Sequence, residues 1–140
     1  MKKITRILMI CATIVAFGFT NPSEVGMGKM VDLTVKYSFK GIVDGYDHDC
    51  KTELYVDGKL VATSTVEKES KPNSVSAKIK KGTHDIKVVN YALYEGLWEA
   101  HTIENNYSQD CLYSATINCK KKSNTIELLF DIDNGTIVVE

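Results

Sequence analysis

The segment from Val31 to Val43 constrains the fold most, because apolar and polar side chains alternate along its whole length. Successive side chains of an extended strand point to opposite sides, so a period of two marks a strand with one buried and one hydrated face. The buried face would carry Val31, Leu33, Val35, Tyr37, Phe39, Gly41 and Val43. We therefore expect a long, half-buried strand here.

Similar runs recur along the chain, separated by turn signals. Asp57-Gly58 and Asn134-Gly135 each stand between apolar-rich runs, which is typical of tight hairpins that need positive φ angles. The run Gly82–Trp98 is expected to form a central strand, with Ile86 and Val88 deeply buried. Eight or nine strands and no helical period predict an all-β sandwich or barrel.

The first residues have the pattern of a signal peptide. Lys2, Lys3 and Arg6 precede an apolar run over residues 7–19, which is shorter than the about 20 residues that span a bilayer. Small residues favour cleavage after Gly18, with Thr20 as the alternative. A buried first helix or a retained anchor is the competing interpretation.

We therefore expect residues 1–20 to be a cleaved signal peptide, residues 21–30 a flexible lead-in and residues 31–140 one β-sandwich domain. The mature chain would be secreted or periplasmic, with no transmembrane span. The leader carries three of the 17 basic residues, which leaves 14 against 18 acidic residues and a net charge of −4. This mild acidity predicts no nucleic-acid partner.

Three cysteines remain after the leader, so at most one intrachain disulfide can form. Export favours such a bridge. Cys111 and Cys119 would lie eight residues apart on one strand, about 27 Å, which is too far for a bond that needs Cα atoms within about 7 Å. We expect Cys50–Cys111, with Cys50–Cys119 as the alternative; buried free thiols are the third possibility.

The loop between the first two predicted strands offers a metal hypothesis. Asp44, Asp47 and Asp49, beside His48, supply hard oxygen ligands that could hold Ca²⁺. Their spacing matches no calcium-loop consensus, and such residues are also common turn formers. We expect no cofactor, and the three histidines, His48, His84 and His101, show no zinc-binding spacing.

Aromatic residues concentrate between residues 91 and 113, and Tyr94, Trp98 and Tyr107 flank predicted loops there. Such side chains could stack on a sugar or pack on a peptide, but for Trp98 the favoured interpretation is the central core aromatic of the sandwich. The chain has no Gly-x-Ser-x-Gly elbow and no glycine-rich phosphate loop, so we expect no catalytic residues and no enzyme activity.

A family resemblance covers residues 52–93. The stretches Val56–Val61 and Ile79–Val88 are similar to the PEGA-type modules of bacterial exported proteins, in which a Val-Asp-Gly hairpin is followed by Gly-Thr-His entering a strand. The Pro-Glu-Gly-Ala motif itself is absent, and residues 67–73 lengthen the connection. The resemblance implies an immunoglobulin-like antiparallel sandwich and a non-catalytic, extracytoplasmic role.

Together these features predict an exported bacterial binding or envelope-associated module. Its partner would be a protein, a peptide or a carbohydrate of the cell envelope. The alternative function is a small secreted hydrolase, or an inhibitor of one, on the same scaffold.

Overall fold

The computed structural model describes residues 28–140, in ten strands and one short 3-10 helix. The predicted signal peptide and most of the predicted lead-in lie outside the described residues. The strands are β1 (Met30–Lys40), β2 (Asp49–Val56), β3 (Lys59–Thr63), β4 (Glu67–Lys68), β5 (Asn73–Lys80), β6 (Gly82–Tyr94), β7 (Leu97–Ala100), β8 (Leu112–Cys119), β9 (Ser123–Asp131) and β10 (Gly135–Val138), and the helix is η1 (Ile103–Asn105). Over residues 28–140, no helix is long and apolar enough to cross a membrane.

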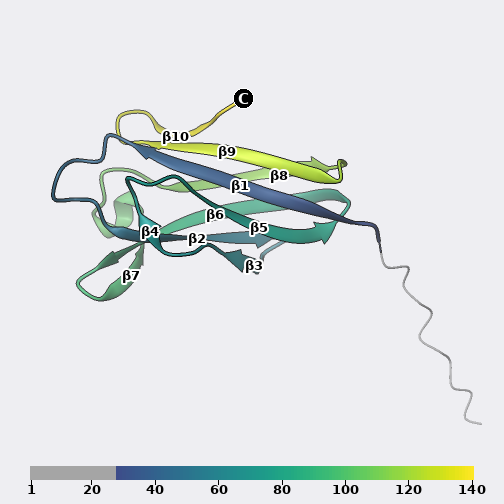
Figure 1. Ribbon diagram of the computed structural model, residues 1–140, viewed down its shortest axis with the longest axis horizontal. Helices are drawn as coiled ribbons and strands as arrows, with labels where there is room; N and C mark the ends of the chain where they lie inside the picture. The colour runs from purple at the N-terminus through teal and green to yellow at the C-terminus, as the bar shows by residue number, and fades with distance from the viewer. Residues whose placement is uncertain (1–27) are drawn as a thin grey trace, which may run out of the picture.

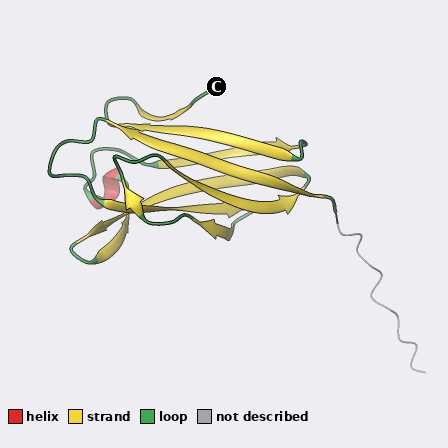
Figure 2. Cartoon of the chain, in the orientation of Figure 1, coloured by secondary structure: helices red, strands yellow, loops and turns green. Residues whose placement is uncertain are grey.

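The strands form two sheets that pack face to face (Figure 1). One sheet has the order β10-β9-β1-β5, and the other has the order β3-β2-β6-β7, with β4 on β2 and β8 on β6. Strands make up most of the described chain. The single turn of η1 lies at one end of the sandwich (Figure 2). The predicted all-β, two-sheet architecture is confirmed, although ten strands form where eight or nine were expected.

One strand pair departs from the predicted antiparallel arrangement. β1 pairs in parallel with β9, from Asp32 opposite Ser123 to Lys40 opposite Asp131. Parallel neighbours need a long crossover connection, and here the chain between them builds the whole second sheet. β1 and β9 therefore finish at the same end of the sandwich, and β6 of the other sheet also finishes there (Figure 1).

The alternation in the first strand is confirmed by burial as far as Tyr37, whereas Gly41 and Val43, predicted on the same face, are exposed. Val31, Leu33, Val35 and Tyr37 face the core and are at most 3% exposed. The strand ends at Lys40, earlier than predicted, because Gly41 takes a φ of +88° that breaks the extended backbone. A Cβ atom at Gly41 would also overlap the side chain of Ile132.

The prediction for Gly82–Trp98 is confirmed in its main points. β6 is central in its sheet, where it pairs with β2 along one edge and with β8 and β7 along the other. Ile86 and Val88 are 1% and 0% exposed. The predicted turn at Asp57-Gly58 forms, with positive φ at both residues. β9 and β10 also form a hairpin, but it turns through residues 132–134, so Gly135 is the first residue of β10 and Asn134 does not take the positive φ that was predicted.

The predicted Cys50–Cys111 disulfide is absent from the structure, and so is its Cys50–Cys119 alternative. Cys50, Cys111 and Cys119 are all free and buried. Cys50 lies on β2 and Cys111 precedes β8, on opposite edges of β6, since Cys50 pairs with Ala92 and the Cys111 carbonyl accepts from Asn90. Two strand spacings amount to about 9.6 Å, beyond the reach of a disulfide.

Candidate functional site

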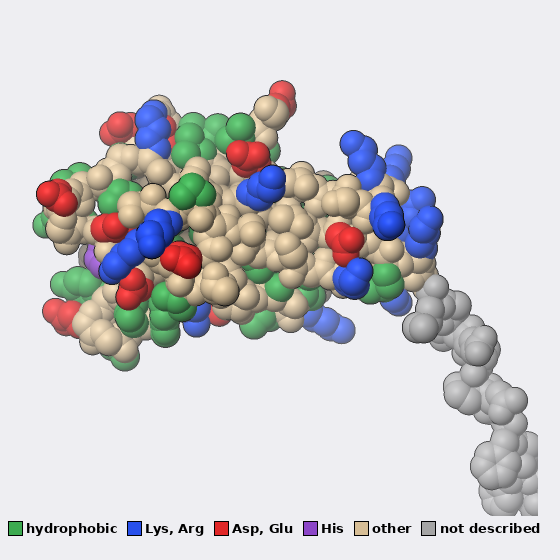
Figure 3. Space-filling model, viewed as in Figure 1, with side chains coloured by type: hydrophobic (Ala, Val, Ile, Leu, Met, Phe, Trp, Pro, Cys, Tyr) green, Lys and Arg blue, Asp and Glu red, His purple; other side chains and the backbone are tan. Residues whose placement is uncertain are grey.

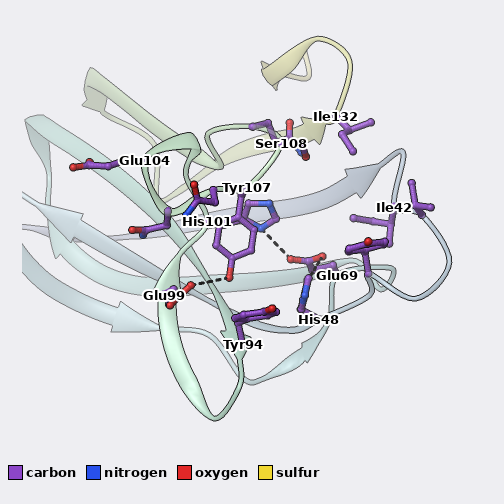
Figure 4. A pocket seen from close by; sticks show the side chains of 15 residues that line it. Ile42, His48, Glu69, Tyr94, Glu99, His101, Glu104, Tyr107, Ser108 and Ile132 are labelled. Atoms are coloured by element: carbon purple, nitrogen blue, oxygen red, sulfur yellow. Dashed lines mark hydrogen bonds and ion pairs between the residues drawn. The ribbon is translucent and has the colours of Figure 1, made fainter.

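A cavity of about 670 Å³ opens at the end of the sandwich where β1, β6 and β9 finish. This volume lies in the range of small-molecule sites, about 300–1,000 Å³. Loops from both sheets surround it, and we refer to it as the end cavity (Figure 4). Its lining consists of Ile42, Val43, Tyr46, His48, Glu69, Tyr94, Glu99, His101, Glu104, Asn105, Asn106, Tyr107, Ser108, Gln109 and Ile132.

The floor of the end cavity is a carboxylate between two imidazoles. Glu69 Oε1 lies 2.9 Å from His101 Nδ1, and Glu69 Oε2 lies 3.6 Å from His48 Nδ1. The side chains of Glu69 and His101 are 1% and 6% exposed, so water reaches them poorly. Figure 4 shows the Glu69 carboxylate directed toward both rings.

The backbone explains why a glutamate from a charged segment turns inward. β4 pairs with the start of β2, placing Glu67 opposite Cys50, and the Glu69 backbone N–H donates to the His48 carbonyl at 3.0 Å. This extra pairing closes one side of the sandwich end. Since side chains alternate along an extended segment, the pairing directs Glu69 inward and leaves Lys68 exposed.

His101 is held by the opposite edge of β6. Its backbone N–H donates to the Asn90 carbonyl at 2.9 Å, and its carbonyl accepts from the Cys111 N–H at 2.8 Å. Its ring stacks on Phe39 with 5.9 Å between ring centroids, and lies 4.4 Å from the ring of Tyr107. The imidazole is thus fixed by packing as well as by its backbone.

Buried polar atoms without hydrogen bonds gather on this floor. Among residues 28–140, five buried side-chain atoms have no hydrogen-bond partner, and four belong to residues lining the end cavity. These four are His48 Nδ1, Glu69 Oε1, His101 Nδ1 and Gln109 Oε1. The close approach of Glu69 to His101 is therefore an electrostatic contact that lacks hydrogen-bond alignment. Unpaired buried polar groups are rare in folded proteins, so their concentration here marks the floor as the candidate binding surface.

The walls are aromatic. The His48 ring makes edge-on contacts with the rings of Tyr94 and Tyr107, each at 6.1 Å between centroids. The Tyr107 hydroxyl donates to Glu99 Oε2 at 3.4 Å. Burial, followed by the charge of Glu99, raises the pKa of Tyr107 to about 12, so its phenol keeps its proton near neutral pH. Tyr46 adds a third, exposed ring at the rim.

The structure brings together two of the three aromatic residues that the sequence suggested. Tyr94 and Tyr107 both line the end cavity, from the end of β6 and from the loop after η1. Trp98 does not line it, and at 37% exposed it is not the predicted core aromatic either. The Lys51 ammonium lies 4.8 Å from the centroid of its ring, so Trp98 packs on the outer face of the sheet.

The three aspartates suggested as metal ligands do not form one site, because two of them have other partners. Asp47 accepts hydrogen bonds from the backbone and the hydroxyl of Ser70, and these bonds lower its pKa. Asp49 pairs with Lys68 at 2.8 Å. Asp44 is exposed in the β1–β2 loop. Throughout the part of the chain that the structure describes, no group of three His, Cys, Asp or Glu residues is arranged to hold a metal ion.

Glu69, His101 and Gln109 are the floor residues that sequence reasoning missed. Glu69 lies in a segment that reads as a charged loop, and the two histidines of the floor are separated by more than fifty residues. The one local signal was the adjacency of His48 to acidic turn residues, which suggested metal binding. The burial of a single carboxylate such as Glu69 produces no periodic pattern in the sequence, so it could not be predicted from one.

The fold and the cavity together define an all-β sandwich with a polar-floored, aromatic-walled site at one end. Comparison with known proteins adds no closer identification: no protein-family model matches the chain, and no curated protein or solved structure matches it.

Proposed function

We propose that this chain is an exported, non-catalytic β-sandwich module that binds a ligand of the cell envelope in its end cavity. The observation that carries the proposal is the gathering of four unpaired buried polar atoms on the cavity floor. Leaving a buried polar group unpaired costs about 1–3 kcal/mol, and a bound ligand would recover that cost. Export is supported by the basic and apolar pattern of residues 1–20.

The kinship with PEGA-type, immunoglobulin-like modules belongs to the same proposal. It is supported by the hairpin at Asp57-Gly58, which forms as that pattern requires, and by entry of Gly82-Thr83-His84 into a central strand. In this assignment the sandwich is a scaffold, and the loops at its end carry the recognition. A protein, peptide or carbohydrate partner would present a small group to the cavity.

A screen with a closed-cavity variant tests the binding function. Nuclear magnetic resonance (NMR) spectra of the ¹⁵N-labelled protein would be recorded with a library of small molecules that includes acids, amines and sugars. Binding compounds should shift the signals of Tyr94, His101 and Tyr107. Ser108→Trp, at an exposed lining position, should abolish the shifts, whereas Ser114→Trp, on the exposed face of β8, should retain them. Shifts confined to other surfaces, or binding unchanged in Ser108→Trp, would refute the proposal.

A hydrolase remains the second candidate, because of one observation. A carboxylate beside an imidazole, as Glu69 lies beside His101, is the arrangement that orients a general base. Ser108 lines the same cavity and could serve as its nucleophile. Release of nitrophenol from short-chain nitrophenyl esters that disappears in both Ser108→Ala and His101→Phe would favour this function over simple binding.

A further inference from the structure

The end cavity has an acidic lining. Its lining contains the carboxylates of Glu69, Glu99 and Glu104 and the imidazoles of His48 and His101, while none of the described lining residues is lysine or arginine. With the carboxylates ionised, the lining carries a charge of −3 when both imidazoles are neutral and −1 when both are protonated. The cavity is therefore negative in every state of its histidines.

The distribution of lysines strengthens this polarity. Lys68 and Lys40, on strands beside the cavity, are each paired with a carboxylate, Asp49 at 2.8 Å and Asp131 at 3.0 Å. A separate group of lysines gathers at the opposite end, where β1 begins, and appears in blue in Figure 3. This group consists of Lys29, Lys80, Lys81, Lys120, Lys121 and Lys122. A field of this shape directs cations toward the acidic end and anions away from it.

The unpaired atoms of the floor specify what kind of cation fits. Glu69 Oε1 and Gln109 Oε1 are acceptors that receive no hydrogen bond, although Glu69 Oε1 lies 2.9 Å from His101 Nδ1, and both residues are at most 5% exposed. A protonated primary amine carries three N–H donors and a positive charge. A quaternary ammonium group has the charge but donates nothing, and a hydroxyl group donates without carrying charge.

The walls suit the same group. Tyr94 and Tyr107 both contact the His48 ring, and the faces of tyrosine rings attract cations through their quadrupole. Glu99, held by the Tyr107 hydroxyl, adds a carboxylate near these rings. Aromatic walls, an acidic rim and acceptors at the floor are complementary to an ammonium group on a short apolar stem.

We propose that the end cavity recognises a primary ammonium group, seated on the acceptors of Glu69 and Gln109 and enclosed by Tyr94 and Tyr107. This inference rests on the proposed binding function and specifies the chemistry of its ligand. Anionic ligands are disfavoured by the charge of the lining. Neutral sugars would satisfy the acceptors but would leave the negative charge uncompensated.

Four probes of similar size test the inference by calorimetry and NMR titration: benzylamine, benzyltrimethylammonium, benzyl alcohol and benzoate. Benzylamine should bind at least about tenfold more tightly than benzyl alcohol, a difference of about 1.4 kcal/mol. Benzyltrimethylammonium should bind more weakly than benzylamine, and benzoate should show no binding. Glu69→Gln and Glu99→Gln should each weaken benzylamine binding by about fivefold or more, while Glu127→Gln, exposed on β9 outside the cavity, should leave it unchanged.

Glu99→Gln keeps the test decisive if Glu69→Gln fails to fold, because Glu99 lies on β7 and a glutamine there can still accept from Tyr107. Equal affinity for benzylamine and benzyl alcohol, with shifts at Tyr94 and Tyr107, would overturn the ammonium assignment and leave the binding function standing. Tighter binding of benzoate than of benzylamine would have the same meaning. If no compound from these probes or from the library shifts a cavity residue, the binding function and the ammonium assignment both fail.

Discussion

The Glu69 carboxylate lies 2.9 Å from the Nδ1 atom of His101, and both side chains are almost completely removed from water. The two residues come from different parts of the chain: Glu69 follows β4, which pairs with β2, and His101 follows β7, on the opposite edge of β6. Their contact therefore joins the two flanks of the larger sheet at the end of the sandwich.

A double-mutant cycle should show that Glu69 and His101 are coupled. His101→Phe keeps a ring against Phe39, and Glu69→Gln keeps the side-chain shape, so each change removes mainly the contact between the carboxylate and the imidazole. Groups in direct contact show coupling of about 0.5–3 kcal/mol, and we expect a value in that range from urea unfolding. Additivity of the two changes within about 0.3 kcal/mol would show that the contact has no energetic significance.

Gly41→Ala should destabilise the protein and reshape the end cavity. Gly41 has a φ of +88°, and a Cβ there would overlap Ile132, which lines the cavity. Gly45→Ala is a matched control, since Gly45 has a φ of +87° but open space around it. Positive φ alone costs about 1–3 kcal/mol, so chemical denaturation should show a loss of that size for Gly45→Ala and a larger loss for Gly41→Ala. Equal losses would mean that the approach to Ile132 is not tight.

The cysteines should be inert in the native protein and free after unfolding. Burial raises the pKa of Cys50 to about 12 and raises that of Cys111 as well, and only the thiolate reacts with iodoacetamide. Intact mass should therefore show no labelling of Cys50, Cys111 and Cys119 in the native state at neutral pH. After denaturation without reductant, all three should be labelled. Labelling of only one of them would demonstrate a disulfide that the structure lacks.

The ion pair between His84 and Asp57 should make stability depend on pH within a defined window. The hydrogen bond to Asp57, 2.7 Å long, raises the pKa of His84 above 6.5, and the hydrogen bond from His84 lowers the pKa of Asp57 below 3.8. A raised histidine pKa stabilises the fold below pH 6.5, and this contribution disappears as pH rises through the folded value. A lowered aspartate pKa stabilises above pH 3.8, and this contribution disappears as pH falls through the folded value.

The difference in melting temperature between the wild type and His84→Gln should therefore be largest between about pH 4 and pH 6.5, and should shrink on either side. Differential scanning calorimetry across this range measures it. Glutamine retains a donor for Asp57 but loses the 2.7 Å contact of His84 Nε2 with the Lys80 carbonyl, so the part of the difference that varies with pH reports the charge. A difference that does not vary with pH would contradict the ion pair.

Most of the fold follows from local patterns in the sequence. The alternation around Leu33 and Val35 indicates an extended strand with one buried face. Asp57-Gly58 indicates a tight turn, because few other residue pairs adopt the positive φ angles that such a turn needs. The parallel pairing of β1 with β9 does not follow, because the register of strands distant in sequence depends on how the two sheets pack. The position of Trp98 could not be predicted from the sequence either, since its large ring packs under Lys51 on an outer face and not in the core.

The candidate site could be predicted only in part. Tyr94 and Tyr107 were identifiable because aromatic residues beside predicted loops have few core positions to fill. Glu69 and His101 were not, because their contact arises from β4 pairing with β2 and β7 pairing with β6, on opposite flanks of the larger sheet. The burial of a carboxylate in a charged segment, such as Glu69, cannot be predicted until its neighbours in space are known.

The central claim is that the floor of the end cavity is completed by a ligand. The most direct measurement is a crystal structure of the protein grown with a saturating concentration of benzylamine. We expect electron density between Tyr94 and Tyr107, with the amine nitrogen within hydrogen-bond distance of Glu69 Oε1. A cavity that contains only ordered water bonded to Glu69 and His101, with benzylamine absent or bound on another face, would contradict it.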